Sequence, residues 1–292
     1  NLPTGHMSPV RTGIPAATWR KMYGFVQPTK STIATVTDNT GMLEQYAEID
    51  AAMKKVYPDI NAFRLMEDRA HIEGMNQEMA DTLFYGNEAT EPEAFTGLAP
   101  RYNDLAAANA ENIIDAGGTG TDNGSIWLVV WGPGSIFGIT PKGSTAGLKV
   151  TDKGLVTKQD TVGSTSGLME VYRTHYTWDL GLVVKDWRYA VRIANVDKSL
   201  LSLIYTSGAF STGAHLPNLL LQAMDLIPSM SFGRPVIYMS RTMRTKFRQQ
   251  LAAAVQNSTL TIENVGGVRT EMYHGIPIRR CDALAADEAR VV

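Results

Sequence analysis

The sequence has little cysteine and little charge. Its 292 residues contain one cysteine, Cys281, which excludes an internal disulfide framework and any zinc site built from several cysteines. Charged residues make up 19% of the chain, and 27 basic residues against 29 acidic ones give a formal net charge of −2. Domains dedicated to nucleic acids usually carry a clear basic excess, so this composition argues against that class.

Long apolar runs are also missing. The most apolar stretches, residues 126–131 and 219–221, are far shorter than the roughly 18–20 residues of a membrane-spanning helix. At 44% hydrophobic residues, the chain is nevertheless too apolar for general disorder. It begins at Asn1 with no basic-then-apolar leader, so we expect that an N-terminal piece was removed or that the sequence is incomplete.

Residues 9–50 are predicted to be extended chain with little core of their own. Recurrent prolines and glycines exclude a long helix, and the β-branched stretch KSTIATVT (30–37) favours a strand. An isolated two-stranded ribbon is marginal in water. The segment must therefore lie on something, either as ordinary strands of this chain's sheet or as an arm that projects.

The clearest helix is predicted over residues 60–85. Asp59 can cap its start and Gly86 can end it. At ~1.5 Å per residue it would be about 39 Å long, which suits a structural strut. Its apolar stripe at helical spacing consists of Leu65, Ile72, Met75, Met79 and Leu83.

Shorter patterns predict the other elements. Residues 104–115 predict a second helix, and the Gly- and Thr-rich stretch 140–167 predicts a long hairpin or surface loop. Alternation from Trp187 to Ile193 predicts a strand over 183–195. Further helices are expected over 216–227 and 240–255, the latter capped by Ser240, with strands over 234–239 and 276–280.

No chemical motif is complete. GSTAG (143–147) and GSTSG (163–167) place threonine where a nucleophile elbow needs serine, and Lys142-Gly143-Ser144 reverses the order of a phosphate loop. None of the five histidines has a second His or Cys at zinc-ligand spacing. We therefore predict no catalytic residue, no cofactor and no metal, which favours a structural or interaction protein.

Three groups of side chains leave alternatives open. The basic residues of 241–248 form either a solvated helix face or a weak contact with nucleic-acid phosphate. Asp282, Asp287 and Glu288 are interpreted as an ordinary surface cluster. Cys281, beside Arg280, is interpreted as a buried or half-buried inert thiol rather than an activated one.

Three stretches carry a family resemblance. They are AFRLMEDRAHIEGMNQEMADTLFYGN (62–87) with FTGLAPRYND (95–104), YRTHYTWDLGLVVKDWRYAVRIANVD (172–197), and RPVIYMSRTMRTKFRQQL (234–251) through HGIPIRRCDALAADEARVV (274–292). In this order they resemble the major capsid proteins of short-tailed double-stranded DNA phages of the epsilon-fifteen type. The resemblance runs from about Arg11 to Val292.

The resemblance implies an α+β protein with the tailed-phage and herpesvirus capsid shell fold. It implies an N-arm remnant and an extended E-loop over residues 1–50. A P-domain would follow over 51–199, with its spine helix at 60–85, a long β-sheet and a surface loop at 140–167, and an A-domain over 200–292. The A-domain part comes last here, whereas in commoner members it precedes the final P-domain strands, so a permuted strand order is expected.

Function then follows as assembly. The resemblance implies that many copies, as pentamers and hexamers, close into an icosahedral shell around a double-stranded DNA genome. The implied partners are decoration or cement, portal and scaffold proteins and weakly held DNA, with no membrane. The implied location is the virion, after assembly in the bacterial host cytoplasm.

The extended ribbon would reach an adjacent subunit and sum many weak contacts. Large aromatic side chains and Arg are favoured at interfaces. The alternative is that the two aromatic residues pack on their own subunit. The candidate contact residues are Trp19, Arg20, Lys21, Tyr23 and Lys30.

Other functions compete with this one. An encapsulin-like compartment would share the fold but need a cargo-peptide groove, which the sequence does not reveal. A hydrolase with a dispersed site would need convergent His, Asp and Glu side chains in a concave pocket. A nucleic-acid-binding protein is disfavoured by the net charge of −2.

Some relatives of this fold cross-link themselves through a Lys–Asn isopeptide bond. Lys21 and Lys30 lie in the corresponding region, but no signal identifies an acceptor. We therefore predict that denatured mature particles run as intact monomer on a gel, and a covalent ladder would contradict this.

Overall fold

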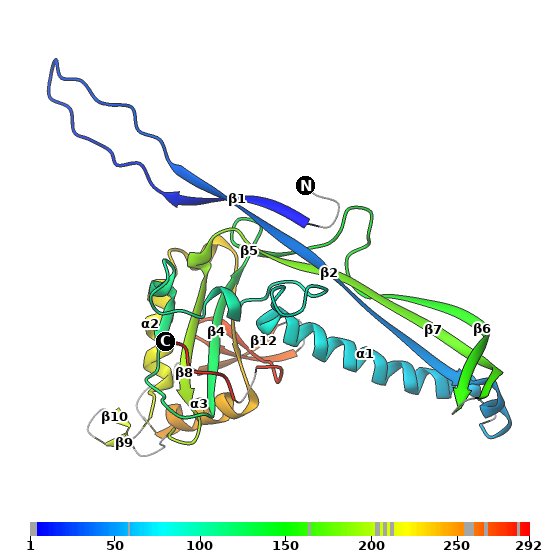
Figure 1. The fold of residues 1–292 in the computed structure, drawn as a ribbon. Helices are drawn as coiled ribbons and strands as arrows, with labels where there is room; N and C mark the ends of the chain where they lie inside the picture. The colour runs from blue at the N-terminus through cyan, green and yellow to red at the C-terminus, as the bar shows by residue number, and fades with distance from the viewer. Residues whose placement is uncertain are drawn as a thin grey trace.

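The computed structural model describes residues 5–57, 59–162, 165–201, 205–206, 209–210, 213–253, 260–265, 268–284 and 287–292. Figure 1 shows a ribbon projecting from one side, a long arm on the other side, and a thicker body that holds the C-terminus, whereas the N-terminal end lies beside the ribbon. Twelve of the described strands join in one sheet, whose main path is β1-β2-β7-β5-β4-β11-β14-β13-β12.

The ribbon and the arm share one strand. β2 (Thr32–Asp50) pairs antiparallel with β1 (Gly5–Gly13) along its first part and with β7 (Thr165–Val184) along residues 40–50. β6 (Lys149–Val162) pairs with the other edge of β7. The extended reading of residues 9–50 is confirmed, and the 140–167 stretch contains the strand of a hairpin rather than only a surface loop.

An ion-pair cluster ties the three strands of the arm together. Glu48 of β2 pairs with Lys158 of β6 at 2.6 Å and with Arg173 of β7 at 2.7 Å. The hydrogen bond from Lys158 is the main cause that lowers the pKa of the Glu48 carboxyl. The short 3-10 turn η1 (Ala51–Lys55) follows β2, and the long helix α1 (Ile60–Tyr85) then carries the chain back along the arm toward the body (Figure 1).

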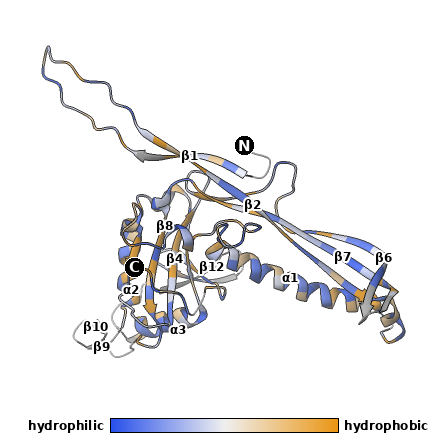
Figure 2. Cartoon of the chain, in the orientation of Figure 1, coloured by the Kyte–Doolittle hydropathy of each residue, from blue (hydrophilic) through white to orange (hydrophobic). Residues whose placement is uncertain are grey.

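The predicted helix over 60–85 is confirmed as α1, caps included. Asp59 accepts hydrogen bonds from the Asn61 and Ala62 amides, both at 3.1 Å, and the Gly86 amide donates to Thr82 at 2.9 Å. Figure 2 shows hydrophilic and hydrophobic residues interspersed along α1.

The predicted apolar stripe of α1 is correct except at Leu65, since Ile72 packs in the cluster of Met75 and Leu83 in the cluster of Met79. Met75 and Met79 are buried, and Met75 packs with Ala47 and Tyr176 of the arm. Leu65, in contrast, is 62% exposed, because the first turns meet the arm through a polar contact, Arg64 with Asp152 at 2.7 Å. Helical spacing identifies a face, but only tertiary packing decides how much of that face is covered.

Two apolar clusters lie on opposite faces of the body's central strands. β4 (Asn123–Trp131) pairs with β8 (Ala190–Asp197) on one side and with β11 (Arg234–Met239) on the other. Ile126 and Leu128 pack under the helices α2 (Leu216–Leu226) and α3 (Arg241–Ala253), whereas Trp127 and Val129 pack against the end of α1 and its exit loop. Both faces of these strands are therefore core.

Several later elements match their predictions. Helices α2 and α3 are present, and the Met243 amide donates to Ser240 Oγ at 3.4 Å, so Ser240 caps α3 as predicted. Strand β11 pairs parallel with β14 (Ile276–Arg280). Residues 254–255 of the helix predicted over 240–255 lie outside the described residues. The remaining strands are β3 (Ile113–Asp115), β5 (Ile136–Ile139), β9 (Tyr205–Thr206), β10 (Ala209–Phe210), β12 (Leu260–Val265) and β13 (Val268–Tyr273).

The predicted helix over 104–115 is wrong. The segment forms turns, the 3-10 turn η3 (Ala110–Asn112) and strand β3. Polar side chains of the segment bond to backbone groups. Asp104 accepts from the Ala106 amide at 2.7 Å, and the Asn112 side chain donates to the Ala190 carbonyl at 2.9 Å. The Asp104 bond is local and competes with helix formation, whereas the Asn112 bond is a tertiary contact with β8.

The predicted strand over 183–195 is interrupted. Trp187–Tyr189 form the 3-10 turn η4, because Asp186 accepts the Arg188 amide at 3.1 Å and pairs with the Arg188 guanidinium at 2.8 Å. The strand that follows, β8, is buried at all eight positions. Its alternation therefore does not separate a core face from a solvent face.

Glu288 corrects the interpretation of the C-terminal carboxylates as a surface cluster. Its carboxylate pairs with Arg192 of β8 at 2.7 Å, and the two side chains are only 6% and 5% exposed. Tyr85 donates to Glu288 at 2.5 Å, and Ser125 contributes its amide at 3.1 Å and its hydroxyl. The end of α1, the central sheet and the last residues of the chain therefore meet at one carboxylate.

We predict that Gly74→Ala stabilises the unassembled subunit. Gly74 lies inside α1, and a Cβ there meets nothing within 4 Å, so the change gains about 0.5–1 kcal/mol of helix propensity. Urea denaturation measures this. Gly86→Ala is the matched control, because its Cβ would lie 2.5 Å from the Phe95 carbonyl. This variant should lower the free energy of unfolding, and an equal effect of the two substitutions would contradict the packing described.

We predict that Glu288→Ala and Arg192→Ala each destabilise the subunit by about 3–5 kcal/mol, because each leaves a buried charge unpaired. The double variant should cost clearly less than the sum of the two single changes. A urea-denaturation double-mutant cycle on unassembled subunit tests this, and strict additivity would contradict a direct pairing.

Candidate inter-subunit interface

The ribbon ends in a bare loop, residues 14–31, called the tip loop from here on. β1 and β2 pair from Gly5 opposite Asn39 to Gly13 opposite Thr32. Residues 14–31 pair with no strand. A turn within them is closed by a hydrogen bond from the Gly24 amide to the Lys21 carbonyl at 3.0 Å, and Tyr23 in this turn has a φ of 62°. In Figure 1 the loop extends far from the rest of the chain.

The structure brings all five candidate contact residues to this loop. Trp19 is 104% exposed and Tyr23 is 100% exposed, and Arg20, Lys21 and Lys30 are exposed as well. The alternative in which Trp19 and Tyr23 pack on their own subunit is therefore excluded. Their contact with a neighbour stays a prediction.

The root of the ribbon is held firmly. Asp38 is buried and pairs with Arg101 at 2.7 Å. The same guanidinium donates to the Thr96 and Gly97 carbonyls at 3.1 Å each, which fixes it to the exit loop of α1. The tip is thus presented on a ribbon whose base is anchored in the body.

A second exposed apolar surface lies at the opposite end of the molecule. Large exposed apolar side chains occur on β6, on β7 and on the first turns of α1 with the preceding segment, and Figure 1 places these elements together in the arm. The sequence reasoning missed this surface; large apolar residues within otherwise polar strands were the available signal. Its members are Val56, Leu65, Met66, Val150, Leu155 and Leu168.

The three arginines of α3 are engaged within the chain. Arg244 pairs with Glu271 at 2.8 Å, Arg248 also pairs with Glu271, and Arg241 pairs with Asp282 at 3.1 Å. These carboxylates compete with phosphate for the guanidinium groups. The solvated-face interpretation of this helix is favoured over a phosphate contact.

Chemistry of an enzyme is not evident in the described part of the chain. No group of three or more His, Cys, Asp and Glu side chains there could hold a metal ion. Cys281 is half-buried, as predicted, and burial raises the pKa of its thiol, which favours the interpretation as an inert thiol over an activated one. Among the described helices, none is long and apolar enough to cross a membrane.

Comparison with known proteins decides the family. The family model for "Major capsid protein GP7" matches residues 1–292. The chain belongs to the GP7 family of major capsid proteins. It is a structural shell protein of a tailed phage, located in the virion, and the predicted family and function are confirmed.

Solved capsid structures agree with GP7 membership. The chain of bacteriophage Epsilon15, solved by cryo-EM, is 33% identical, with a TM-score of 0.70 over 100% of this chain and 86% of that chain. The capsid chain of bacteriophage JBD30 is 9% identical, with a TM-score of 0.51 over 97% of this chain and 86% of that chain, and shows the shared fold alone. Among curated proteins, no sequence matches this GP7 chain.

Proposed function

We propose that the tip loop is the end of an E-loop that binds a neighbouring subunit in the shell. The observation that carries this proposal is the complete exposure of Trp19 and Tyr23 at the end of an anchored ribbon. Two bare aromatic side chains expose apolar surface that burial would stabilise. Aromatic residues are also those on which interface energy concentrates.

The contact is heterologous, because the tip loop of one copy meets a different surface of the next. Heterologous contacts generate rings when their rotation closes, so we propose pentamers and hexamers that tile an icosahedral shell around double-stranded DNA. Decoration or cement, portal and scaffold proteins complete the particle in the host cytoplasm. The subunit itself has no catalytic activity, needs no membrane and holds DNA only weakly, as its formal charge of −2 supports.

We keep the proposed division into an E-loop region (1–50), a P-domain (51–199) and an A-domain (200–292). The boundary between the P-domain and the A-domain does not separate two sheets. β4 of the proposed P-domain pairs with β11 of the proposed A-domain over residues 127–131 and 234–238. The two domains therefore share a continuous sheet, and motion between them must bend that sheet.

The test of this proposal is the double variant Trp19→Ala/Tyr23→Ala. Each hot-spot truncation costs about 2 kcal/mol or more, about 30-fold in the dissociation constant of the contact. We expect loss of closed shells by electron microscopy, with the thermal unfolding of the free subunit unchanged because both side chains are fully exposed.

Gln27→Ala, in the same exposed loop, is the matched control and should assemble normally. Shells formed by the double variant at the native subunit concentration would overturn the proposed role of the tip loop.

A further inference from the structure

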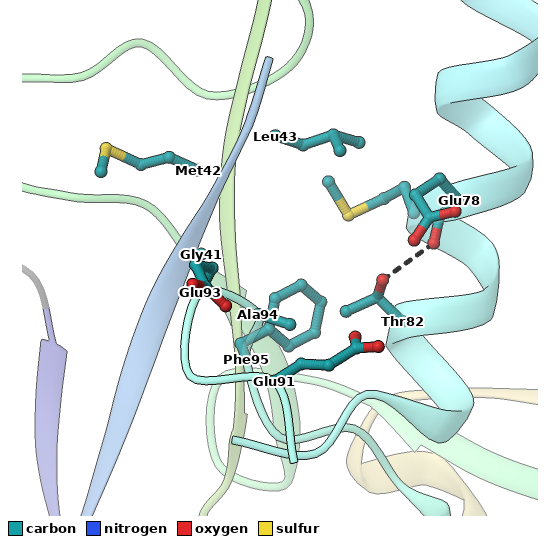
Figure 3. A pocket seen from close by; sticks show the side chains of 10 residues that line it. Gly41, Met42, Leu43, Glu78, Thr82, Glu91, Glu93, Ala94 and Phe95 are labelled. Carbon is teal, nitrogen blue, oxygen red and sulfur yellow. Dashed lines mark hydrogen bonds between the residues drawn. The ribbon is translucent and has the colours of Figure 1, made fainter. Parts of the chain in front are cut away.

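A pocket of about 370 Å³ opens between the root of the arm and the second half of α1. Leu43, Met79 and Phe95 supply apolar lining, and Figure 3 shows the Phe95 and Leu43 side chains on the side of β2 that faces the helix. Gly41 lets the 93–95 loop approach the strand, since a Cβ there would lie 3.1 Å from the Glu93 carbonyl. The volume lies near the lower end of the roughly 300–1,000 Å³ of pockets that take small ligands.

The rim of this pocket carries uncompensated negative charge. Glu78, Glu91 and Glu93 line it, and no Lys or Arg does. Within the described part of the chain, none of these three carboxylates takes part in an ion pair. Burial and, secondly, the charge of Glu91 raise the pKa of nearby Asp81. The negative rim thus contrasts with Glu48, Glu271 and Glu288, which all have cationic partners.

The tip loop has the complementary composition. Residues 14–31 contain three cations, Arg20, Lys21 and Lys30, and no Asp or Glu. None of the three is in an ion pair within the described residues. Beside them stand the exposed apolar side chains of Trp19 and Tyr23. A basic segment with aromatic side chains fits an apolar pocket with an acidic rim.

The occupant of the pocket cannot be the subunit's own tip loop. The pocket is lined by residues 41–43 of β2, and the loop ends at Ser31, ten residues before Gly41, where the unbroken strand β2 begins. An extended strand advances ~3.3 Å per residue, so the strand that builds the pocket carries its own loop away from it. Only the loop of another copy can arrive there.

We propose that the tip-loop segment 19–25 of a second copy docks in this pocket, with its aromatic residues against the apolar lining and Arg20 and Lys21 facing Glu91 and Glu93. The proposal rests on the proposed role of the tip loop and adds its receptor surface. Each subunit then offers one loop and one pocket, which is a head-to-tail contact that repeats around a ring.

The experiment is a charge swap in the full chain. Arg20→Glu/Lys21→Glu and, separately, Glu91→Lys/Glu93→Lys place like charges opposite each other, so each should raise the subunit concentration at which half the protein assembles by at least about tenfold. The four-residue swap should restore assembly to within about threefold of the native chain. Glu73→Lys/Glu111→Lys changes the net charge equally away from the pocket and should assemble normally. Thermal unfolding of each free variant verifies folding, as all the altered side chains are exposed.

A second measurement locates the contact. In a Cys281→Ala background, Thr18→Cys with Ala94→Cys places one thiol in the loop and one in the pocket, with the charges intact. A short bismaleimide added to assembled shells should yield a multimer ladder. Thr18→Cys with Leu168→Cys, at the far end of the arm, should stay monomeric.

The outcomes separate the two proposals. If loop reversal blocks assembly while pocket reversal does not, or if the swap fails to rescue folded protein, the tip loop binds elsewhere and this inference is overturned while the proposed function stands. If neither reversal affects assembly, this inference is overturned, and the Trp19→Ala/Tyr23→Ala variant decides the proposed function separately. Cross-linking of the loop to a different protein in place of a second copy would likewise overturn the inference.

Discussion

The unbroken backbone of β2 is the constraint on which the rest of the structure depends. Its first part pairs with β1 and its last part with β7, so one set of strand hydrogen bonds holds both the projecting ribbon and the arm. Antiparallel pairing leaves little freedom to slide, since a shift by one residue would turn every side chain to the other face. The direction in which the tip loop points is therefore decided in the sheet, and the Asp38–Arg101 pair holds it at the root.

The body supplies the rigid base for this arrangement. Its central strands are covered on both faces, by α2 and α3 on one and by the end of α1 with its exit loop on the other. Glu288 joins the last residues to this core through Arg192, Ser125 and Tyr85. A buried pair of this kind stabilises little relative to an apolar core, but leaving one partner alone is costly, which makes the C-terminal segment an integral part of the body.

The low content of charged residues and the internal pairing of many carboxylates fit a subunit that assembles into a shell. Apolar side chains are exposed at both ends of the subunit, at the tip loop and at the β6–β7 hairpin, whereas many carboxylates of the body and the arm are paired internally. A subunit that tiles with copies of itself buries part of its surface against them, and near neutrality limits repulsion between many like copies. The composition thus fits a protein whose partners are other copies of itself.

Local patterns in the sequence determined the helix 60–85 with its Asp59 and Gly86 ends, the extended character of residues 9–50, and the absence of a complete catalytic motif, because caps, periodicity and residue spacing are local properties. Three segments, in their order along the sequence, also indicated the family. Tertiary structure alone decided that Leu65 is exposed, that residues 104–115 form turns, that Glu288 is buried beside Arg192, and that Trp19 and Tyr23 touch nothing in their own chain. Each of these depends on partners 78 to 110 residues away or on their absence, and no local pattern records such partners.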